Sequence, residues 1–137
     1  MTKFLTILLV ILVTGCNNAK QETPAKQSDL VIMTPQGMNQ ARMNDTLVIY
    51  EKVCRGCAYE ESTHFEIEDS LNLVKIVKME TIDNNSPDMD GGSIDKHIFL
   101  APVKPGETKL KLFKFNTETP STEDSLVFTY YKIKIIN

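Results

Sequence analysis

The chain has 137 residues, with 15 Lys or Arg against 18 Asp or Glu, so its formal net charge is −3. This length corresponds to one small domain that can bury a modest core. Without a basic excess the composition argues against a nucleic-acid partner, and the interspersed charges do not form a polybasic patch for a membrane surface.

The N-terminus has the features of an export signal. An apolar run from Phe4 to Val13 follows the single cation Lys3. A membrane-spanning helix needs about 20 apolar residues, so this run has instead the proportions of a signal-peptide core. The following "VTGC", which ends at Cys16, resembles the lipobox of bacterial lipoproteins. In that family the cysteine is lipidated and becomes the first residue of the mature chain.

The resemblance implies that residues 1–15 are a lipoprotein signal peptide and that Cys16 carries acyl chains that anchor the protein to a membrane. Asn17 occupies the position at which Asp would favour retention in the inner membrane. We therefore expect a lipoprotein of the bacterial cell envelope, in the outer membrane and facing the periplasm or the cell surface. Disulfides are permitted outside the cytoplasm.

The next segment, residues 16–29, is polar and lacks apolar periodicity. We interpret it as a lipidated flexible tether that reaches on the order of 20 Å as a coil. The folded domain is expected to comprise residues 30–137.

Strand-like runs separated by turn signals fill this domain. Alternating apolar and polar residues, or short β-branched runs, predict strands, whereas no helical period of useful length is present. A shift of phase at Val74 indicates a β-bulge in the fourth run. We predict an all-β antiparallel sandwich of about seven strands, at residues 30–33, 46–50, 64–68, 71–79, 97–101, 108–115 and 125–136.

The segment "CRGC" is open to three interpretations. With Cys16 committed to lipid, Cys54 and Cys57 are an even pair. The four residues of a β-turn bring the outer Cα atoms within about 7 Å, and Gly56 can adopt the positive φ that several turns require. We therefore expect a structural disulfide that holds the turn and directs Arg55 outward.

The two other interpretations of this pair are weaker. A catalytic redox pair sits at a helix N-terminus, whereas this pair follows a predicted strand and precedes Glu60 and Glu61, which would raise a thiol pKa. A zinc site needs four ligands, and His64 and His97 lack the spacing of a ligand pair. We expect no metal and no cofactor.

The segment "NNSPDMDGGS" is the most loop-like part of the domain. Asp88 and Asp90, with Asp95 shortly after them, give it a partial likeness to a calcium loop, but Ser86 and His97 occupy positions where that loop needs acids. A solvated turn is the better interpretation. Because the chain also lacks a Gly-x-Ser-x-Gly motif, we expect no catalytic residues and no enzyme activity.

The order of these segments resembles the chagasin-type inhibitors of cysteine peptidases. The likeness covers residues 44–136 and includes "NDTLVIYEKVCRGCAYE", a Gly-Gly loop and "PVKPGETKLKLFKF". Members of that family are immunoglobulin-like sandwiches, often exported, that place three loops across a papain-like active site. The resemblance therefore implies an immunoglobulin-like β-sandwich and a peptidase as partner.

The inhibitory motifs of the family are matched only in part. The first, Asn-Pro-x-Thr-Gly followed by an aromatic residue, one further residue and commonly Trp, places Gly56 on the glycine, Cys57 on the aromatic residue and Tyr59 on the Trp. The second, Gly-x-Gly-Gly, keeps Gly91 and Gly92. The third, Arg-Pro-Trp, is not supplied by "NTETPS".

We predict a lipid-anchored binding or interaction module of the cell envelope that holds a protein or glycan ligand with its loops. The alternatives are a chagasin-like inhibitor, thiol-disulfide exchange at the cysteine pair, and an accessory subunit of an envelope assembly. The expected ligand-binding residues are Arg55, Gly56, Tyr59, Asp88, Asp90, Gly91 and Gly92.

Overall fold

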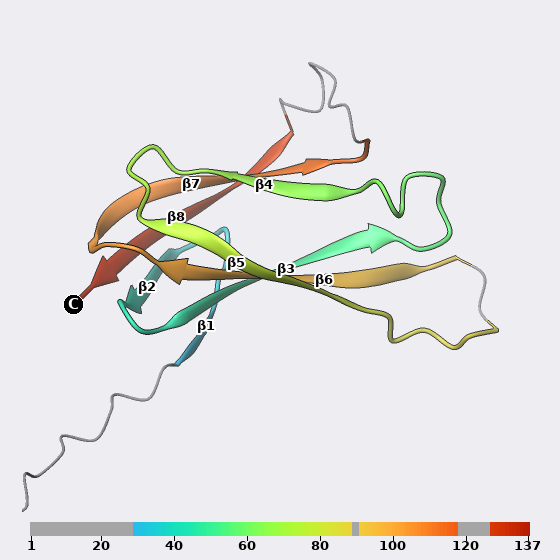
Figure 1. Ribbon diagram of the computed structural model, residues 1–137, viewed down its shortest axis with the longest axis horizontal. Helices are drawn as coiled ribbons and strands as arrows, with labels where there is room; N and C mark the ends of the chain where they lie inside the picture. Colours follow the sequence, from blue (N-terminus) through green and yellow to red (C-terminus); the bar gives the residue numbers. More distant parts are fainter. Residues whose placement is uncertain (1–28, 89–90, 118–126) are drawn as a thin grey trace, which may run out of the picture.

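A computed structural model describes residues 29–88, 91–117 and 127–137. Its elements are eight strands, drawn in Figure 1: β1 (Leu30–Ile32), β2 (Met38–Arg42), β3 (Thr46–Cys54), β4 (His64–Glu68), β5 (Val74–Ile82), β6 (Ser93–Pro102), β7 (Gly106–Phe115) and β8 (Phe128–Ile136). They form two four-stranded sheets, with the order β1-β3-β6-β5 in the first and β2-β8-β7-β4 in the second. The all-β sandwich predicted from the sequence is confirmed.

Two strand pairs depart from the purely antiparallel sandwich that we expected. β1 pairs with β3, and β2 with β8, in parallel, while every other pair is antiparallel. The cause is the N-terminal segment, which forms an edge strand of the first sheet and then crosses to become an edge strand of the second. Both sheets are thereby extended by a strand whose neighbour runs in the same direction.

The sequence did not predict β2. Its residues "MNQAR" include no β-branched or aromatic side chain, and the strand bears the buried polar residue Asn39. The Asn39 amide accepts a hydrogen bond from the Thr34 N–H (2.8 Å) and donates to the carbonyls of Thr34 and Lys132 (each 2.9 Å). These partners satisfy the buried amide, so that it anchors β2 instead of destabilising it.

The predicted bulge is present, but not at Val74. The register of β5 against β6 shifts between Ile76 and Lys78, which leaves Val77 as the extra residue. Val74 is buried and pairs regularly with Pro102.

The core lies between the sheets and is mostly aliphatic. Each strand sends alternate side chains inward, and burying one large aliphatic side chain contributes about 1.5–3 kcal/mol. Neither Cys54 nor Cys57 belongs to this core. The members of this core cluster with 0% exposure are Leu47, Ile49, Ile98, Leu100, Leu110 and Ile133.

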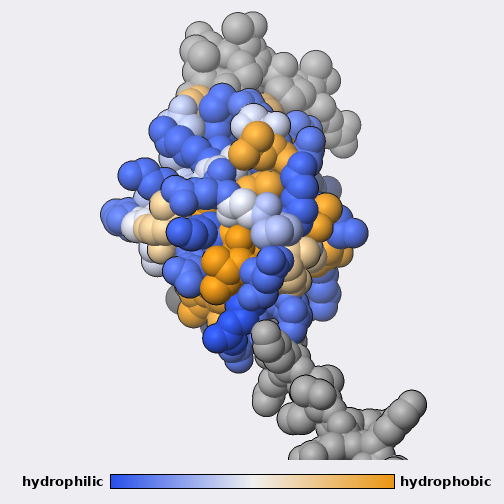
Figure 2. All heavy atoms as spheres, turned by 90° about the vertical axis from the view of Figure 1, so that its left-hand side faces the viewer, coloured by the Kyte–Doolittle hydropathy of each residue, from blue (hydrophilic) through white to orange (hydrophobic). Residues whose placement is uncertain are grey.

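The two ends of the sandwich differ in their connections. One end carries the C-terminus and the β2–β3, β4–β5 and β6–β7 connections, two of which meet where Val103 N–H donates to the Leu73 carbonyl (2.7 Å). Figure 2 shows this end as a mainly hydrophilic surface with scattered hydrophobic residues. The opposite end carries the loops that contain the predicted ligand-binding residues.

Candidate functional site

Three connections begin and end at this opposite end of the sandwich: β3–β4, β5–β6 and β7–β8. The last residue of β3 pairs with the first residue of β6, and the first residue of β4 pairs with the last residue of β7. The start of β8 pairs with β7 close to the same point. Most of the β7–β8 connection, residues 118–126, lies outside the described residues.

The β3–β4 loop opens with a disulfide-closed turn. Cys54 and Cys57 are disulfide-bonded, with Cα atoms 5.8 Å apart, as the sequence predicted. Gly56 has a φ of 73°, a conformation that glycine adopts without steric cost. The Glu60 carboxylate accepts a hydrogen bond from the Gly56 N–H, and the Glu60 N–H donates to the Cys57 carbonyl (3.0 Å). The turn is thus closed both covalently and by hydrogen bonds.

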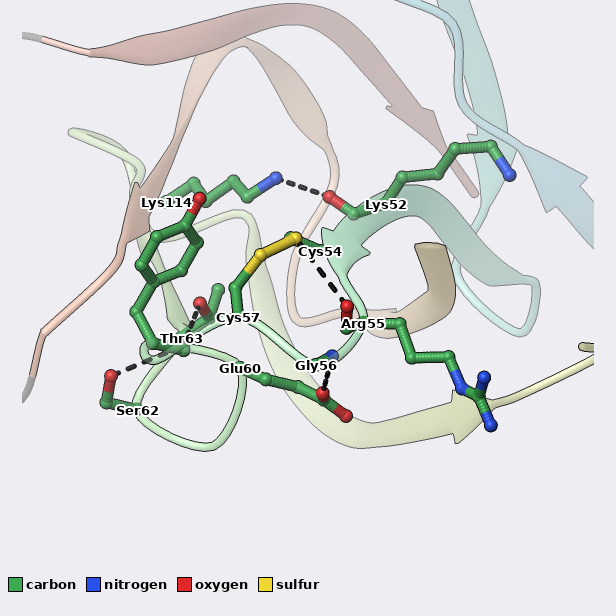
Figure 3. The surroundings of a disulfide bond; sticks show 10 residues. Lys52, Cys54, Arg55, Gly56, Cys57, Glu60, Ser62, Thr63 and Lys114 are labelled. Carbon is green, nitrogen blue, oxygen red and sulfur yellow. Dashed lines mark hydrogen bonds between the residues drawn. A yellow bond between two sulfur atoms is a disulfide. The ribbon is translucent and has the colours of Figure 1, made fainter. Parts of the chain in front are cut away.

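Arg55 joins this turn to the β5–β6 loop. Its backbone N–H donates to the Gly92 carbonyl (3.1 Å), and its Nε donates to Asp83 Oδ2 (2.8 Å). Only 19% of the Arg55 side chain is exposed. Figure 3 shows the side chain running away from the disulfide. The outward presentation of Arg55 that we expected is therefore wrong, because its guanidinium is engaged within the protein.

Asp83 and Asn85 shape the β5–β6 loop. Asp83 Oδ1 accepts hydrogen bonds from the Asn85 backbone N–H (2.9 Å) and from Asn85 Nδ2 (2.7 Å). These two bonds hold the pKa of the Asp83 carboxyl below its usual value. The hydrogen bond and the positive charge of Arg55 contribute less to the same shift. Asn85 Nδ2 also donates to the Ser93 carbonyl (2.8 Å), so this amide bridges both sides of the loop.

The predicted Gly91 and Gly92 are required by the backbone. Their φ angles are 80° and 94°, in a region that other residues rarely adopt. A Cβ atom on Gly92 would lie 3.3 Å from Asn85 Oδ1. Asp88 is exposed on this loop, whereas Asp90 lies outside the described residues. Gly56, Gly91 and Gly92 therefore set the loop conformations.

The second half of the β3–β4 loop is attached to the second sheet. Ser62 Oγ donates to the Asn116 carbonyl (2.6 Å), and Thr63 Oγ1 donates to the Tyr59 carbonyl (2.7 Å). Tyr59 itself is 42% exposed. Between this loop and the flanks of the β7–β8 connection lies a pocket lined by Val53, Cys54, Tyr59, Thr63, Lys114, Asn116 and Val127.

Lys114 connects the two sheets beneath this pocket. Its Nζ extends from β7 and donates to the backbone carbonyl of Lys52 in β3, as drawn in Figure 3. The half-buried Glu51 lies nearby: burial raises the pKa of its carboxyl, and the Lys114 ammonium opposes that rise. Burial, reinforced by the Glu51 charge, raises the pKa of Tyr131 to about 12. The base of the site therefore holds a half-buried carboxyl group beside a lysine ammonium and a buried tyrosine.

A row of rings braces the strands that carry the loop bases. It runs over the second sheet from His64 to Phe115, Phe113, Phe128 and Tyr130. The successive centroid distances are 5.1, 5.9, 5.3 and 4.8 Å. Such pairs add about 0.5–1.5 kcal/mol beyond their burial. β4, β7 and β8 are thus held together where their loops begin.

Within the described ranges, no group of three or more His, Cys, Asp or Glu side chains is placed to hold a metal ion. Cys54 ends a strand, and the described part of the chain includes no helix whose N-terminus could lower its thiol pKa. No helix among those residues is long and apolar enough to cross a membrane.

Comparisons with known proteins identify the fold. No family model and no curated protein matches the sequence. The structure is similar to that of the cysteine protease inhibitor EhICP2 from Entamoeba histolytica, with a TM-score of 0.60 and 19% identity over 82% of this chain and 100% of that chain. It is also similar to amebosin, with a TM-score of 0.55 and 12% identity over 80% of this chain and 99% of that one. The immunoglobulin-like sandwich implied by the sequence resemblance is confirmed.

The site combines predicted and unpredicted residues. The structure brings Arg55 against Gly92, so two of the predicted loops are in contact. Sequence reasoning missed the roles of Asp83, Asn85 and Lys114. An Asp two residues before an Asn, directly after a strand, is a local signal for an Asx turn. No comparable signal exists for Lys114, because its partner is a backbone carbonyl in the other sheet.

Proposed function

We propose that this protein inhibits a papain-like cysteine peptidase by placing the loops at one end of its sandwich across the active site. The supporting observation is the direct contact of the β3–β4 and β5–β6 loops through Arg55, on a fold similar to that of a cysteine protease inhibitor. Two loops tied together in the free protein can dock as one surface, which lowers the ordering cost of binding. This proposal replaces the general binding module as the leading function.

Inhibition needs no catalytic group in this chain. A rigid loop surface that fills the cleft of the peptidase excludes the substrate. Tyr59 occupies the position of the family's Trp and is 42% exposed, so its ring can provide apolar contact area to a partner. Cys57 replaces the aromatic residue of the motif, and its disulfide with Cys54 restricts the conformation of the loop.

A titration with papain tests the proposal. The full-length chain is expected to slow papain at micromolar concentration or below, and to leave a serine peptidase unaffected. Tyr59→Ala should weaken inhibition about tenfold, since interface aromatic residues commonly contribute more than 1 kcal/mol. Tyr50→Ala is the matched control, because Tyr50 is similarly exposed (45%) but lies within β3, outside the loops. Full papain activity at micromolar protein would refute the proposal.

A second candidate is the lipid-anchored module that holds another protein or a glycan. The sequence "NTETPS", which lacks the family's Arg-Pro-Trp, favours it, because the third inhibitory motif is missing. Affinity capture from envelope extracts, followed by mass spectrometry, distinguishes the two. A ligand that is not a peptidase, and whose capture fails with Tyr59→Ala, would support this second function.

The proposed site of action is the bacterial cell envelope, with the domain tethered by acyl chains on Cys16. Cys16 and the tether up to residue 28 lie outside the described residues, so this part of the proposal rests on the lipobox. Growth with a clickable fatty acid should label the full-length chain, and Cys16→Ser should abolish the label. Equal labelling of the two chains would exclude lipidation at this cysteine.

A further inference from the structure

The Cys54–Cys57 disulfide is placed so that it affects the loops without supporting the core. Cys54 is the last residue of β3 and Cys57 lies in the loop that follows. Both residues are only partly buried, and Cys54 lines the pocket at the loop end. The hydrophobic core does not include either of them. A small reductant can therefore reach the bond, and its loss leaves the packing between the sheets intact.

The residues enclosed by this bond include the one that joins two loops. Arg55 donates its N–H to Gly92 and its Nε to Asp83, and both bonds depend on the orientation of the Arg55 peptide and Cα. The bond to Cys57 restricts that orientation, together with the positive φ of Gly56. Opening the bond gives Arg55 and Gly56 rotational freedom, and the two loops lose their fixed relative position.

The other attachments of the loop would survive reduction. Thr63 and Ser62 hold its second half to the Tyr59 and Asn116 carbonyls. The change on reduction is therefore confined to the tip, residues 54–58, and to its contact with the β5–β6 loop. Such local opening is a low-energy event compared with global unfolding.

We infer that the Cys54–Cys57 bond is a redox switch for the loop surface: the oxidised protein holds the two loops together and inhibits, and a dithiol reductant releases them. This inference rests on the proposed function. A papain-like peptidase acts through a thiolate and so requires reducing conditions. The same reductant would then activate the peptidase and weaken the binding of its inhibitor.

The chemistry is thiol–disulfide exchange. A thiolate of the dithiol attacks one sulfur of the pair, and the Cys54–Cys57 bond breaks with its electron pair on the other sulfur, which takes a proton. The second thiol of the reductant then attacks the mixed disulfide and releases the second cysteine as a thiol. The cysteine pair gains two electrons and two protons, and the dithiol becomes a cyclic disulfide.

The test compares three samples: the oxidised full-length protein, the reduced protein, and the variant Cys54→Ser/Cys57→Ser. The reduced protein is prepared with dithiothreitol, which is then removed under nitrogen. Papain is activated and then freed of small thiols. The reduced protein and the variant are expected to inhibit at least tenfold more weakly than the oxidised protein, and reductant should not change the variant. Equal inhibition constants for the oxidised protein and the variant would overturn the switch and leave the proposed function standing.

Amide hydrogen exchange gives a readout that does not depend on a peptidase. The Arg55 N–H, whose acceptor is the Gly92 carbonyl, should exchange at least tenfold faster in the reduced protein, while the Leu110 N–H in the core strand β7 should not change. If the oxidised protein fails to inhibit papain, the proposed function is lost, and equal Arg55 exchange rates in the two redox states would overturn the switch separately.

Discussion

Replacing Gly92 with alanine tests whether the conformation of the β5–β6 loop holds the site together. Gly92 has a φ of 94°, and its carbonyl accepts the Arg55 N–H. An alanine at this position either keeps a strained backbone or changes it. A changed backbone moves the carbonyl away from Arg55, which separates the two loops.

The expected cost follows from the backbone and from one contact. A non-glycine residue held in a sparsely populated region costs about 1–3 kcal/mol. The new Cβ would lie 3.3 Å from Asn85 Oδ1, a tight contact that a small shift of the amide can relieve. We therefore expect the lower part of this range, about 1–2 kcal/mol. Such a difference changes the equilibrium for local opening about 5–30-fold.

The assay is amide exchange at Arg55, combined with urea unfolding and papain inhibition. Gly92→Ala should speed Arg55 exchange and weaken inhibition by about this factor. Gly37→Ala is the matched control: Gly37 has no positive φ, and its Cβ would lie 3.9 Å from Thr34 Oγ1, an ordinary contact. This control should be neutral or stabilise by about 0.4–1 kcal/mol. Unchanged Arg55 exchange in Gly92→Ala would refute the reasoning.

Two further predictions concern the sandwich itself. Leu110→Ala, at a core position with 0% exposure, should lower the free energy of unfolding in urea by about 2–5 kcal/mol; a loss below about 1 kcal/mol would contradict the packing described. Glu51→Gln should alter the pH dependence of stability. Burial raises the pKa of Glu51 above its ordinary 4.5, so the folded state binds this proton more tightly than the unfolded chain. Stability is then lost as the pH rises from the unfolded to the folded pKa, and Glu51→Gln should remove that loss. Thermal unfolding should show the variant more stable than the wild type at pH 7 but not at pH 4, and the reverse order would exclude this effect.

Most strands could be predicted from the sequence, because alternation is a short-range property. In "HFEIE" and "KLKLFKF" the inward residues Phe65, Ile67, Leu110 and Leu112 alternate with charged or polar residues, as period two requires. Lys114 has the same phase as the two leucines but is charged, and its Nζ reaches the other sheet. β2 could not be predicted in this way. Its stability depends on Asn39, whose partner Lys132 is distant in the sequence and adjacent only after folding. The parallel pairing of β1 with β3, and of β2 with β8, is likewise a consequence of where β3 and β8 lie in the folded chain.

The sequence by itself determined the elements whose causes are local: the period-two strands, the glycine-containing turn and the cysteine pair that closes it. The tertiary structure decided the role of the residue inside that turn. Arg55 was expected to face a partner, but it is bound by Asp83 and Gly92 from another loop. The physical reason is that strand pairing between β3 and β6 brings these segments together, and pairing over long sequence separations leaves no local pattern in the sequence.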